Sequence, residues 1–248
     1  MATLAVPYHL DEHLDPFTVG VPVDHEITAP LPPGDPWSRM AVLYEAVASV
    51  VSRQESPALV VSGDCTTSLG VLAGLRRSGH DVGVVWLDAH ADFHTEATTT
   101  SGYLGGMPLA LAAGIGTLTL PAALGLNPVS QSRIVLVDAR DTDPAEQSLL
   151  EQSSVARTRV QDLDDSNLPS GEIYLHLDLD VCDPSDVPDL LFPVPGGPAL
   201  ADVTAAVERT VATGRVAAVG VAATWHHRHP GSPVHRDVVR RMAQAAAG

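Results

Sequence analysis

The segment that most constrains this chain is residues 84–92, VVWLDAHAD, in which four apolar residues lead directly into alternating polar ones. An apolar run bounded by polar residues is typical of a strand buried inside a parallel sheet. Ligands of such sheets bind just beyond the carboxyl ends of the strands. Alternate spacing would point Asp88, His90 and Asp92 to one side, and two carboxylates with an imidazole suit a divalent cation. A strand cap made of solvated polar residues is the alternative interpretation.

Strands and helices alternate along the rest of the chain. Apolar runs predict strands at residues 3–6, 58–61, 82–87, 133–137, 172–180 and 215–223. Helical spacing or a helix-start proline predicts helices that begin at 37 and 144, one that ends near 78, and others at 107–113, 201–212 and 234–246. Residues 93–106 read as a polar loop, and no structure is assigned to 114–131. We therefore predict one α/β domain over residues 1–248, with a parallel sheet covered on both faces.

The composition argues against two classes of partner. The chain has a net charge of −16, and all its basic residues are arginines. Such an acidic surface repels nucleic acids and anionic membranes, and it favours small cationic or zwitterionic ligands. Two cysteines outside any CxxC pair cannot build a disulfide framework, and the N-terminal segment is too acidic for a signal peptide. We expect a cytoplasmic protein without a membrane-spanning segment.

Candidate metal ligands follow three separate apolar runs. These residues are Cys65 after the first run, Asp88, His90 and Asp92 after the second, and Asp178 and Asp180 at the end of the third. Strand ends that meet at one edge can surround two cations, and bridging carboxylates hold such a pair close enough for two-metal hydrolysis. The plainer interpretations are a strand-to-turn transition before Asp183-Pro184 and a small buried cysteine.

Three ordered motifs resemble the arginase/agmatinase (ureohydrolase) family. The segments SGDCTTSLG, VWLDAHADFHTEATTTSGYLGGMPLA and LHLDLDVCDPSDVP are similar to the family's GGDHS, DAHAD…TTTSGN-x-HG-x-P and S-x-D-x-D-x-x-D-P, with order and spacing kept over about residues 58–225. The segment ARDTDPAE also resembles the family's R-D-x-D-x-x-E. The resemblance implies a three-layer α/β/α sandwich with two Mn²⁺ ions that hydrolyses the guanidino group of a small molecule.

The resemblance further implies which residues do this. Asp88 and Asp178 would bridge the two ions, with Cys65 and Asp92 completing one site and His90 and Asp180 the other. A substrate α-carboxylate would bind Ser101, and an α-amino group would bind Asp143 and Glu146, directly or through water. Asp92 would also assist attack on the guanidine carbon.

Two departures from the family concern charge. Cys65 stands where the family has a histidine ligand, and a thiolate adds negative charge to aspartates that would otherwise balance two divalent ions. Trp225, or Thr224 if the strand slips by one residue, stands where the family has a glutamate that pairs with the guanidinium. An unpaired guanidinium beside two cations is costly to bury. We therefore expect a substrate that enters neutral, namely Nω-hydroxy-L-arginine, which would yield L-ornithine and hydroxyurea, while L-arginine would be a poor substrate.

Two further departures concern the proton shuttle and the substrate carboxylate. Gly105 occupies the position of the family histidine that passes a proton to the departing amine. Tyr103 replaces an asparagine near the substrate carboxylate, where we expect it to contact the substrate. Phe93 and His94 also differ from the family pattern, which has Ile or Val followed by Asn. His94 could line the substrate pocket or replace the shuttle, as could His226, His227 and His229, although a solvated loop is an equal alternative for those three.

Other functions remain open at this point. One is an ordinary ureohydrolase of the arginase, agmatinase, guanidinobutyrase or formimidoylglutamase type, although Ser101, Asp143 and Glu146 favour an α-amino acid substrate. The other is a binding protein without catalysis on the same scaffold, against which the retained aspartates argue. We expect a monomer, because the chain ends soon after the segments with which the family forms trimers.

Overall fold

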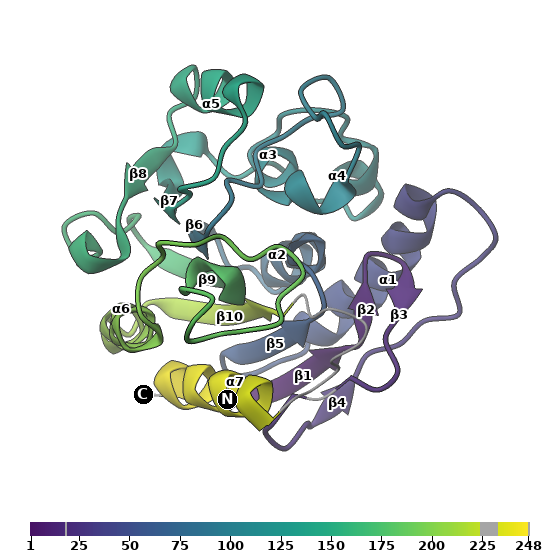
Figure 1. Ribbon diagram of the computed structural model, residues 1–248. Helices are drawn as coiled ribbons and strands as arrows, with labels where there is room; N and C mark the ends of the chain where they lie inside the picture. The colour runs from purple at the N-terminus through teal and green to yellow at the C-terminus, as the bar shows by residue number, and fades with distance from the viewer. Residues whose placement is uncertain (18, 224–232, 248) are drawn as a thin grey trace.

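The protein is built around one parallel sheet (Figure 1). The structure is a computed structural model that describes residues 1–17, 19–223 and 233–247. Within these residues the sheet has eight strands in the order β4-β1-β5-β10-β9-β6-β7-β8, and every pair is parallel. The five central strands are β5 (Ala58–Ser62), β10 (Val216–Ala222), β9 (Glu172–Asp178), β6 (Val82–Asp88) and β7 (Ile134–Asp138). The outer strands are β1 (Ala2–Val6), β4 (His25–Glu26) and β8 (Ala156–Thr158).

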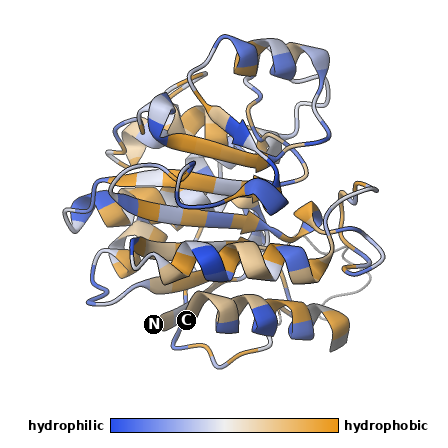
Figure 2. Ribbon diagram, turned by 90° about the vertical axis from the view of Figure 1, so that its left-hand side faces the viewer, coloured by the Kyte–Doolittle hydropathy of each residue, from blue (hydrophilic) through white to orange (hydrophobic). Residues whose placement is uncertain are grey.

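Helices cover the two faces of the sheet, as the alternation of elements predicted. One face packs against α1 (Pro36–Val51), α2 (Ser68–Arg77), α3 (Pro108–Ala112) and α4 (Thr119–Ala123), and the other against α6 (Leu200–Ala212) and α7 (Pro233–Ala247). The helix α5 (Pro144–Glu151) follows β7. Successive residues of a strand point to opposite faces of the sheet and so pack into two different hydrophobic cores. Trp86 packs on the side of α2 and α3, and Leu87 packs on the side of α6 and α7. Figure 2 shows apolar residues concentrated in the strands and mixed residues along the helices.

The sequence missed the shortest elements. The edge strands β4 and β8 and the hairpin of β2 (Tyr8–His9) with β3 (Glu12–His13) span two or three residues each, too few to show a period. The helix α4 lies within the stretch that received no assignment. The strand expected over 172–180 was too long, because β9 ends at Asp178 and a 3-10 turn (Leu179–Val181) follows.

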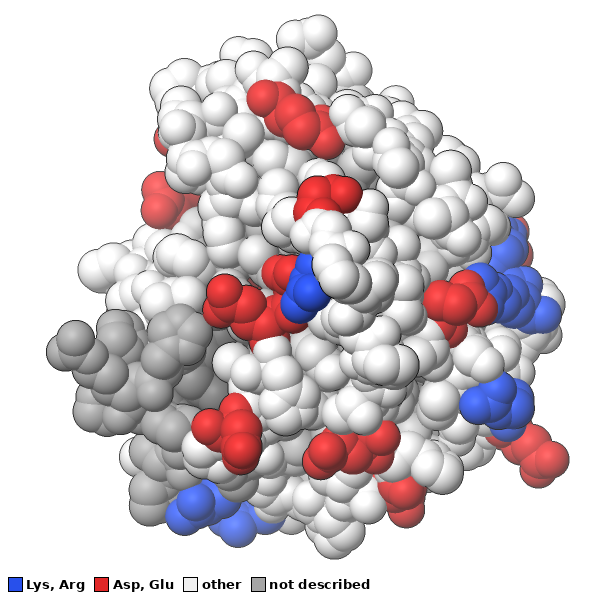
Figure 3. Space-filling view, turned by 90° about the vertical axis from the view of Figure 1, so that its right-hand side faces the viewer, with Lys and Arg blue, Asp and Glu red and all other residues white. Residues whose placement is uncertain are grey.

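The surface carries scattered acidic groups. Figure 3 shows one face on which acidic side chains occur in more places than arginines. In the part of the chain that the structure describes, no helix combines the length and apolar character needed to cross a membrane.

Candidate metal centre and substrate cavity

Three strand ends bring the predicted ligands to one edge of the sheet. Cys65 begins the 3-10 turn after β5, where the Asp64 carboxylate accepts the backbone N–H of Thr66 at 2.7 Å and sets the turn. Asp178 ends β9 and accepts the backbone N–H of Asp180 at 3.0 Å. Asp88 ends β6, which pairs with β9 in parallel register. Because these strands are parallel, their carboxyl ends meet at the same edge.

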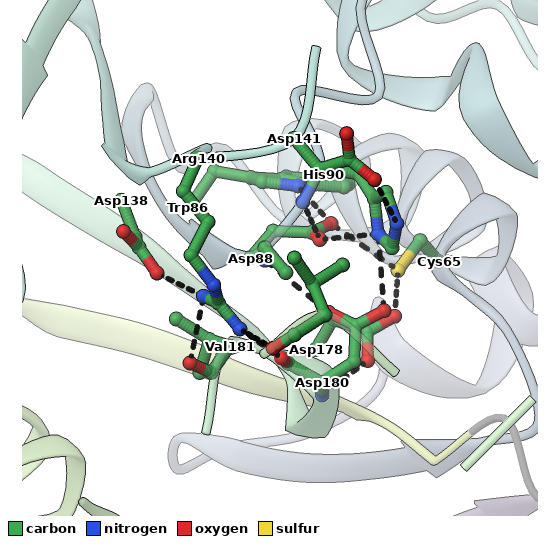
Figure 4. A network of polar contacts seen from close by, with 12 residues as sticks. Cys65, Trp86, Asp88, His90, Asp138, Arg140, Asp141, Asp178, Asp180 and Val181 are labelled. Carbon is green, nitrogen blue, oxygen red and sulfur yellow. Dashed lines mark hydrogen bonds and ion pairs between the residues drawn. The ribbon is translucent and has the colours of Figure 1, made fainter. Parts of the chain in front are cut away.

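Two groups of ligand atoms form there, and Asp88 belongs to both (Figure 4). In the first group, the Sγ atom of Cys65 lies 2.9 Å from Oδ2 of Asp178 and 3.9 Å from Oδ2 of Asp88. In the second, Nδ1 of His90 lies 3.1 Å from Oδ2 of Asp180 and 3.4 Å from Oδ1 of Asp88. Within each group the ligand atoms lie no more than 4.8 Å apart. This spacing is compatible with one cation per group and with Asp88 as a shared ligand.

Asp92 reaches the cavity through a turn and not along the strand that its spacing suggested. The strand ends at Asp88 and does not continue through the motif, since the chain turns and Asp92 adopts a left-handed φ of 51°. Its backbone carbonyl accepts the N–H groups of Leu109 and Ala110, at 3.0 and 3.2 Å, and so fixes the start of α3. Asp92 belongs to neither ligand group. Its Oδ2 atom is buried and lacks a hydrogen-bond partner among the described residues, so it is available to a ligand in the cavity.

The electrostatics of the cluster favour a bound cation. Burial, and then the charge of neighbouring aspartates, raises the pKa of Asp92 and of Asp178 well above the usual range, and raises the pKa of Asp180 to about 7. Burial acts to lower the pKa of His90, but hydrogen bonds and charges from Asp180 and Asp88 raise it to about 12. Burial beside Asp178 also raises the pKa of the Cys65 thiol. The set of carboxylates, one imidazole and one thiol therefore fits divalent cations. Such cations would replace the protons that these closely spaced acidic groups hold.

An aromatic stack supports Asp88 from below. The Trp86 indole donates its N–H to Oδ2 of Asp88 at 3.1 Å and stacks on the His176 ring at 3.7 Å between centroids. The Tyr174 hydroxyl lies 3.0 Å from Nδ1 of His176, and burial lowers the pKa of His176 to about 3, so this ring is neutral. The sequence interpretation missed this support. Its signal was available, because His176 stands where the family motif S-x-D-x-D has its serine.

An arginine joins the loops around the cluster without entering it. The Arg140 guanidinium pairs with Asp138 and donates to the backbone carbonyls of Val181, Asp180 and Val194 at 3.0, 3.1 and 2.6 Å. It thereby fixes the loop after β7 to the turn after β9 (Figure 4). Its charge is directed to Asp138 and these carbonyls, which leaves the carboxylates of the cluster available to cations.

A cavity of about 350 Å³ opens above the cluster. This size falls in the range of small-molecule sites. The predicted site residues that line it are Cys65, His90, Asp92, His94, Ser101, Tyr103, Asp143, Glu146, Asp178 and Asp180. Asp88 is 1% exposed and lies beneath the cavity. Thr224 and Trp225 lie outside the described residues, as do His226, His227 and His229, so their predicted roles stay predictions.

One end of the cavity is built from α5 and the loop after β6. Asp143 precedes α5, and Glu146 lies in its first turn. Nε2 of His94 lies 3.4 Å from Oδ2 of Asp143 and 3.8 Å from Oε2 of Glu146. The Glu146 carboxylate also accepts the Phe93 backbone N–H at 2.9 Å, and burial raises the pKa of Glu146 despite this hydrogen bond. This cluster of acids can bind a cationic amino group.

Beyond the glycines at 105 and 106, two residues line the cavity that the sequence did not predict there. Asp141 lies with Oδ2 at 4.0 Å from Nε2 of His90, and it belongs to the ARDTDPAE segment that carried a recognisable signal. Phe192, in the loop between β9 and α6, packs edge-on to His90 at 6.4 Å and against Tyr103 at 5.0 Å. Only the tertiary structure reveals Phe192, because its loop has no motif.

The protein combines a parallel α/β sheet with two candidate cation sites beneath a cavity of small-molecule size. This combination is typical of metal-dependent α/β enzymes. A family comparison narrows the class, since the model of the arginase family matches residues 3–223. The chain belongs to the arginase family, whose members are hydrolases that act on guanidino groups.

Individual relatives agree with this membership. The chain is 32% identical over 168 residues to an arginase of Bacillus subtilis, an alignment that covers 62% of this chain and 56% of the relative. It is 31% identical over 199 residues to the N(omega)-hydroxy-L-arginine amidinohydrolase of Streptomyces lavendulae, with 74% of this chain and 70% of that protein covered. The match thus spans little more than half the length of the bacterial arginases.

Solved structures show the same fold. The arginase of Bacillus caldovelox superposes with a TM-score of 0.83 at 21% identity, covering 99% of this chain and 96% of that one. The Entamoeba histolytica arginase superposes with a TM-score of 0.81 at 20% identity, covering 100% of this chain and 98% of that one. The arginase-like α/β architecture expected from the sequence is therefore confirmed.

Proposed function

We propose that this chain is a two-manganese hydrolase that converts Nω-hydroxy-L-arginine to L-ornithine and hydroxyurea. The observation that carries the proposal is a single cavity that joins two groups of candidate metal ligands to an acidic end suited to an amino acid. The name of the Streptomyces lavendulae relative supports this substrate, whereas most of the curated relatives are named arginases.

The two ligand groups suggest how the cations would be held. Cys65, Asp88 and Asp178 would hold one ion, and Asp88, His90 and Asp180 the other. By analogy with the family, Asp178 would also bridge to the second ion and Asp92 would join the first. Carboxylate and imidazole ligands suit Mn²⁺, while the thiol shifts the first site toward softer metals. When bound, the two ions would acidify a water molecule and polarise the guanidine.

The protein's own groups would position the reactants. Asp92 has a buried carboxylate oxygen beside the cavity that no described residue hydrogen-bonds, so it can accept a proton from the attacking water. Asp143 and Glu146 would bind the α-amino group, with His94 between them as a further substrate contact. Ser101 would bind the α-carboxylate from the polar loop. Anchoring at this end would hold the guanidine over the cluster and supply proximity.

The choice of substrate rests on charge. Neither Thr224 nor Trp225 is acidic, so the expected partner for a guanidinium is missing from this position of the sequence. An N-hydroxyguanidine has an electronegative oxygen that lowers its basicity, so it can enter neutral. A cationic guanidinium would instead remain unpaired next to two divalent ions, which is costly.

The second candidate is hydrolysis of L-arginine itself, which the names of most relatives favour. The test compares the two substrates at saturating Mn²⁺ and measures ornithine. We expect kcat/KM for Nω-hydroxy-L-arginine to exceed that for L-arginine by about 10²-fold, on the order of a lost buried charge partner. Equal or better turnover of L-arginine would refute the neutral-substrate argument and leave an arginase.

Metal content distinguishes an enzyme from a binding protein. We expect two manganese ions per chain after dialysis, and a Cys65→His variant with altered metal stoichiometry or rate. Absence of bound manganese together with no turnover of any guanidine would support a non-catalytic binding protein. A Cys65→His variant unchanged in both measurements would show that the thiol is not a metal ligand.

The biological setting is also a proposal. The resemblance to the hydroxyarginine enzyme suggests a role in antibiotic biosynthesis, that of D-cycloserine. Both cysteines are free and buried, which agrees with a reducing cytoplasm. We propose a monomer, and size-exclusion chromatography with light scattering at micromolar concentration tests it. A trimer would contradict this expectation.

A further inference from the structure

Tyr103 fills the space that a larger residue at position 105 would need. A Cβ atom built on Gly105 would lie 2.3 Å from Cε1, 2.4 Å from Cζ and 2.5 Å from the hydroxyl oxygen of Tyr103. Contacts this short between non-bonded atoms are not tolerated. The tyrosine and the glycine are therefore one paired arrangement, in which the phenol reaches into the cavity beside the backbone of residue 105.

A histidine from the N-terminal hairpin holds the phenol in place. Nε2 of His9 lies 3.2 Å from the Tyr103 hydroxyl, and the two rings stack with centroids 5.9 Å apart and an interplanar angle of 17°. The hairpin is fixed to the loop before Cys65, since the Gly63 N–H donates to the Tyr8 carbonyl at 3.0 Å and the Leu10 N–H donates to Asp64 at 2.6 Å. The position of His9 is therefore set by the backbone of the metal-site loop.

The contacts of the imidazole define its proton arrangement. Nδ1 of His9 lies 3.3 Å from the Gly63 carbonyl, which can only accept, so Nδ1 carries a hydrogen. In the imidazolium form, Nε2–H then donates to the Tyr103 oxygen and leaves the phenolic hydrogen free to point elsewhere. Burial raises the pKa of Tyr103, so its hydroxyl keeps its hydrogen. Together the two residues form a chain that ends in a donor on the cavity wall.

We propose that Tyr103 protonates the departing amine and that His9 resupplies Tyr103. This inference rests on the proposed guanidine hydrolysis. When the bond between the central carbon and the departing nitrogen breaks, its electron pair stays on nitrogen, which takes the Tyr103 hydroxyl hydrogen. The Tyr103 oxygen takes the hydrogen of His9 Nε2 in the same step, so no phenolate accumulates. His9 is left neutral, with its Nδ1–H still on the Gly63 carbonyl, and regains a proton from solvent.

The first experiment separates proton delivery from packing. Tyr103→Phe keeps the ring and removes the hydroxyl, and His9→Gln keeps a polar contact and removes the transferable proton. We expect each to lower kcat by about 10²-fold with KM changed less than about threefold, as for loss of a general acid. His13→Gln, on the exposed strand of the same hairpin, is the matched control and should keep wild-type kcat.

The outcomes of this experiment are distinct. A Tyr103→Phe variant with wild-type kcat overturns the proposal, as does a rise in KM at constant kcat, which would make Tyr103 only a wall of the cavity. Failure of the wild type to release ornithine from either guanidine overturns the proposed function and the relay together. If the wild type releases ornithine and both Tyr103→Phe and His9→Gln keep the wild-type kcat, the relay alone is overturned.

A second set of variants tests the pairing by thermal stability first and by activity second. Gly105→His should lower the Tm of the metal-free protein by about 3–10 °C, because its Cβ meets the Tyr103 ring. Adding Tyr103→Asn should restore the Tm and place a histidine in the vacated space. We expect this double variant to exceed Tyr103→Asn alone in kcat by at least about tenfold. An unchanged Tm in Gly105→His, or no gain in the double variant, would contradict the paired arrangement.

Discussion

The buried acidic cluster predicts that the metal-free protein loses stability as the pH rises. Asp180 is 5% exposed, and burial followed by the charge of Asp88 raises its pKa to about 7, against the hydrogen bond from His90 that lowers it. In the unfolded chain an aspartate titrates near about 3.9. Between these two pKa values the folded chain keeps a proton that the unfolded chain has lost. The contribution of Asp180 to the free energy of unfolding is therefore fully present below about pH 4 and is lost as the pH rises through 7.

The magnitude follows from the size of the shift. A difference of about three pKa units corresponds to about 4 kcal/mol, of which about 3 kcal/mol falls between pH 5 and pH 8. A change of about 1 kcal/mol moves the Tm of a domain of this size by about 2–4 °C, so the Tm should fall by about 6–12 °C over that interval. His90, with its pKa of about 12, adds a loss of the same sign above about pH 6.5.

Differential scanning calorimetry at pH 5, 6, 7 and 8 measures this effect, with chelator in one series and Mn²⁺ in the other. The Tm should fall much less in the Mn²⁺ series, because the cation replaces the protons of the cluster. Asp180→Asn cannot ionise and should flatten the slope of the chelated series. The reasoning is refuted if the Tm of the chelated wild type stays constant or rises from pH 5 to pH 8. It is equally refuted if Asp180→Asn shows the slope of the wild type.

Three further substitutions test other parts of the site. Gly220→Ala would place a Cβ 2.2 Å from the Tyr174 hydroxyl, and it should lower the free energy of unfolding in urea by about 1–3 kcal/mol. The loss should be smaller when Gly220→Ala is combined with Tyr174→Phe, and additive losses would contradict the contact. Trp86→Phe removes the N–H group that donates to Asp88, and it should weaken Mn²⁺ binding by about 10–100-fold in isothermal titration. Unchanged affinity would show that the indole does not support the metal site. Glu146→Gln should raise KM about tenfold with kcat nearly unchanged, and a loss confined to kcat would place this carboxylate at the reacting atoms instead.

Local patterns carried most of the architecture. Each long strand was predicted within a few residues, because a buried parallel strand needs a continuous apolar run, and VVWL before Asp88 is such a run. Errors arose where geometry depends on a turn. β9 stops at Asp178 because its carboxylate caps a 3-10 turn, and Asp92 leaves the strand direction through a left-handed turn. Neither event has a periodic signature.

What the sequence by itself determined is the chemistry at the strand ends. Parallel strands deliver their carboxyl ends to one edge, so Cys65, Asp88 and Asp178 had to meet once the alternation of strands and helices was recognised. What only the tertiary structure decided is which residues surround that chemistry. His9 comes to Tyr103 from 94 positions away, through a hairpin too short for any pattern to show. The physical reason is that a strand end is fixed by local hydrophobic periodicity, whereas a cavity wall is fixed by the packing of distant loops.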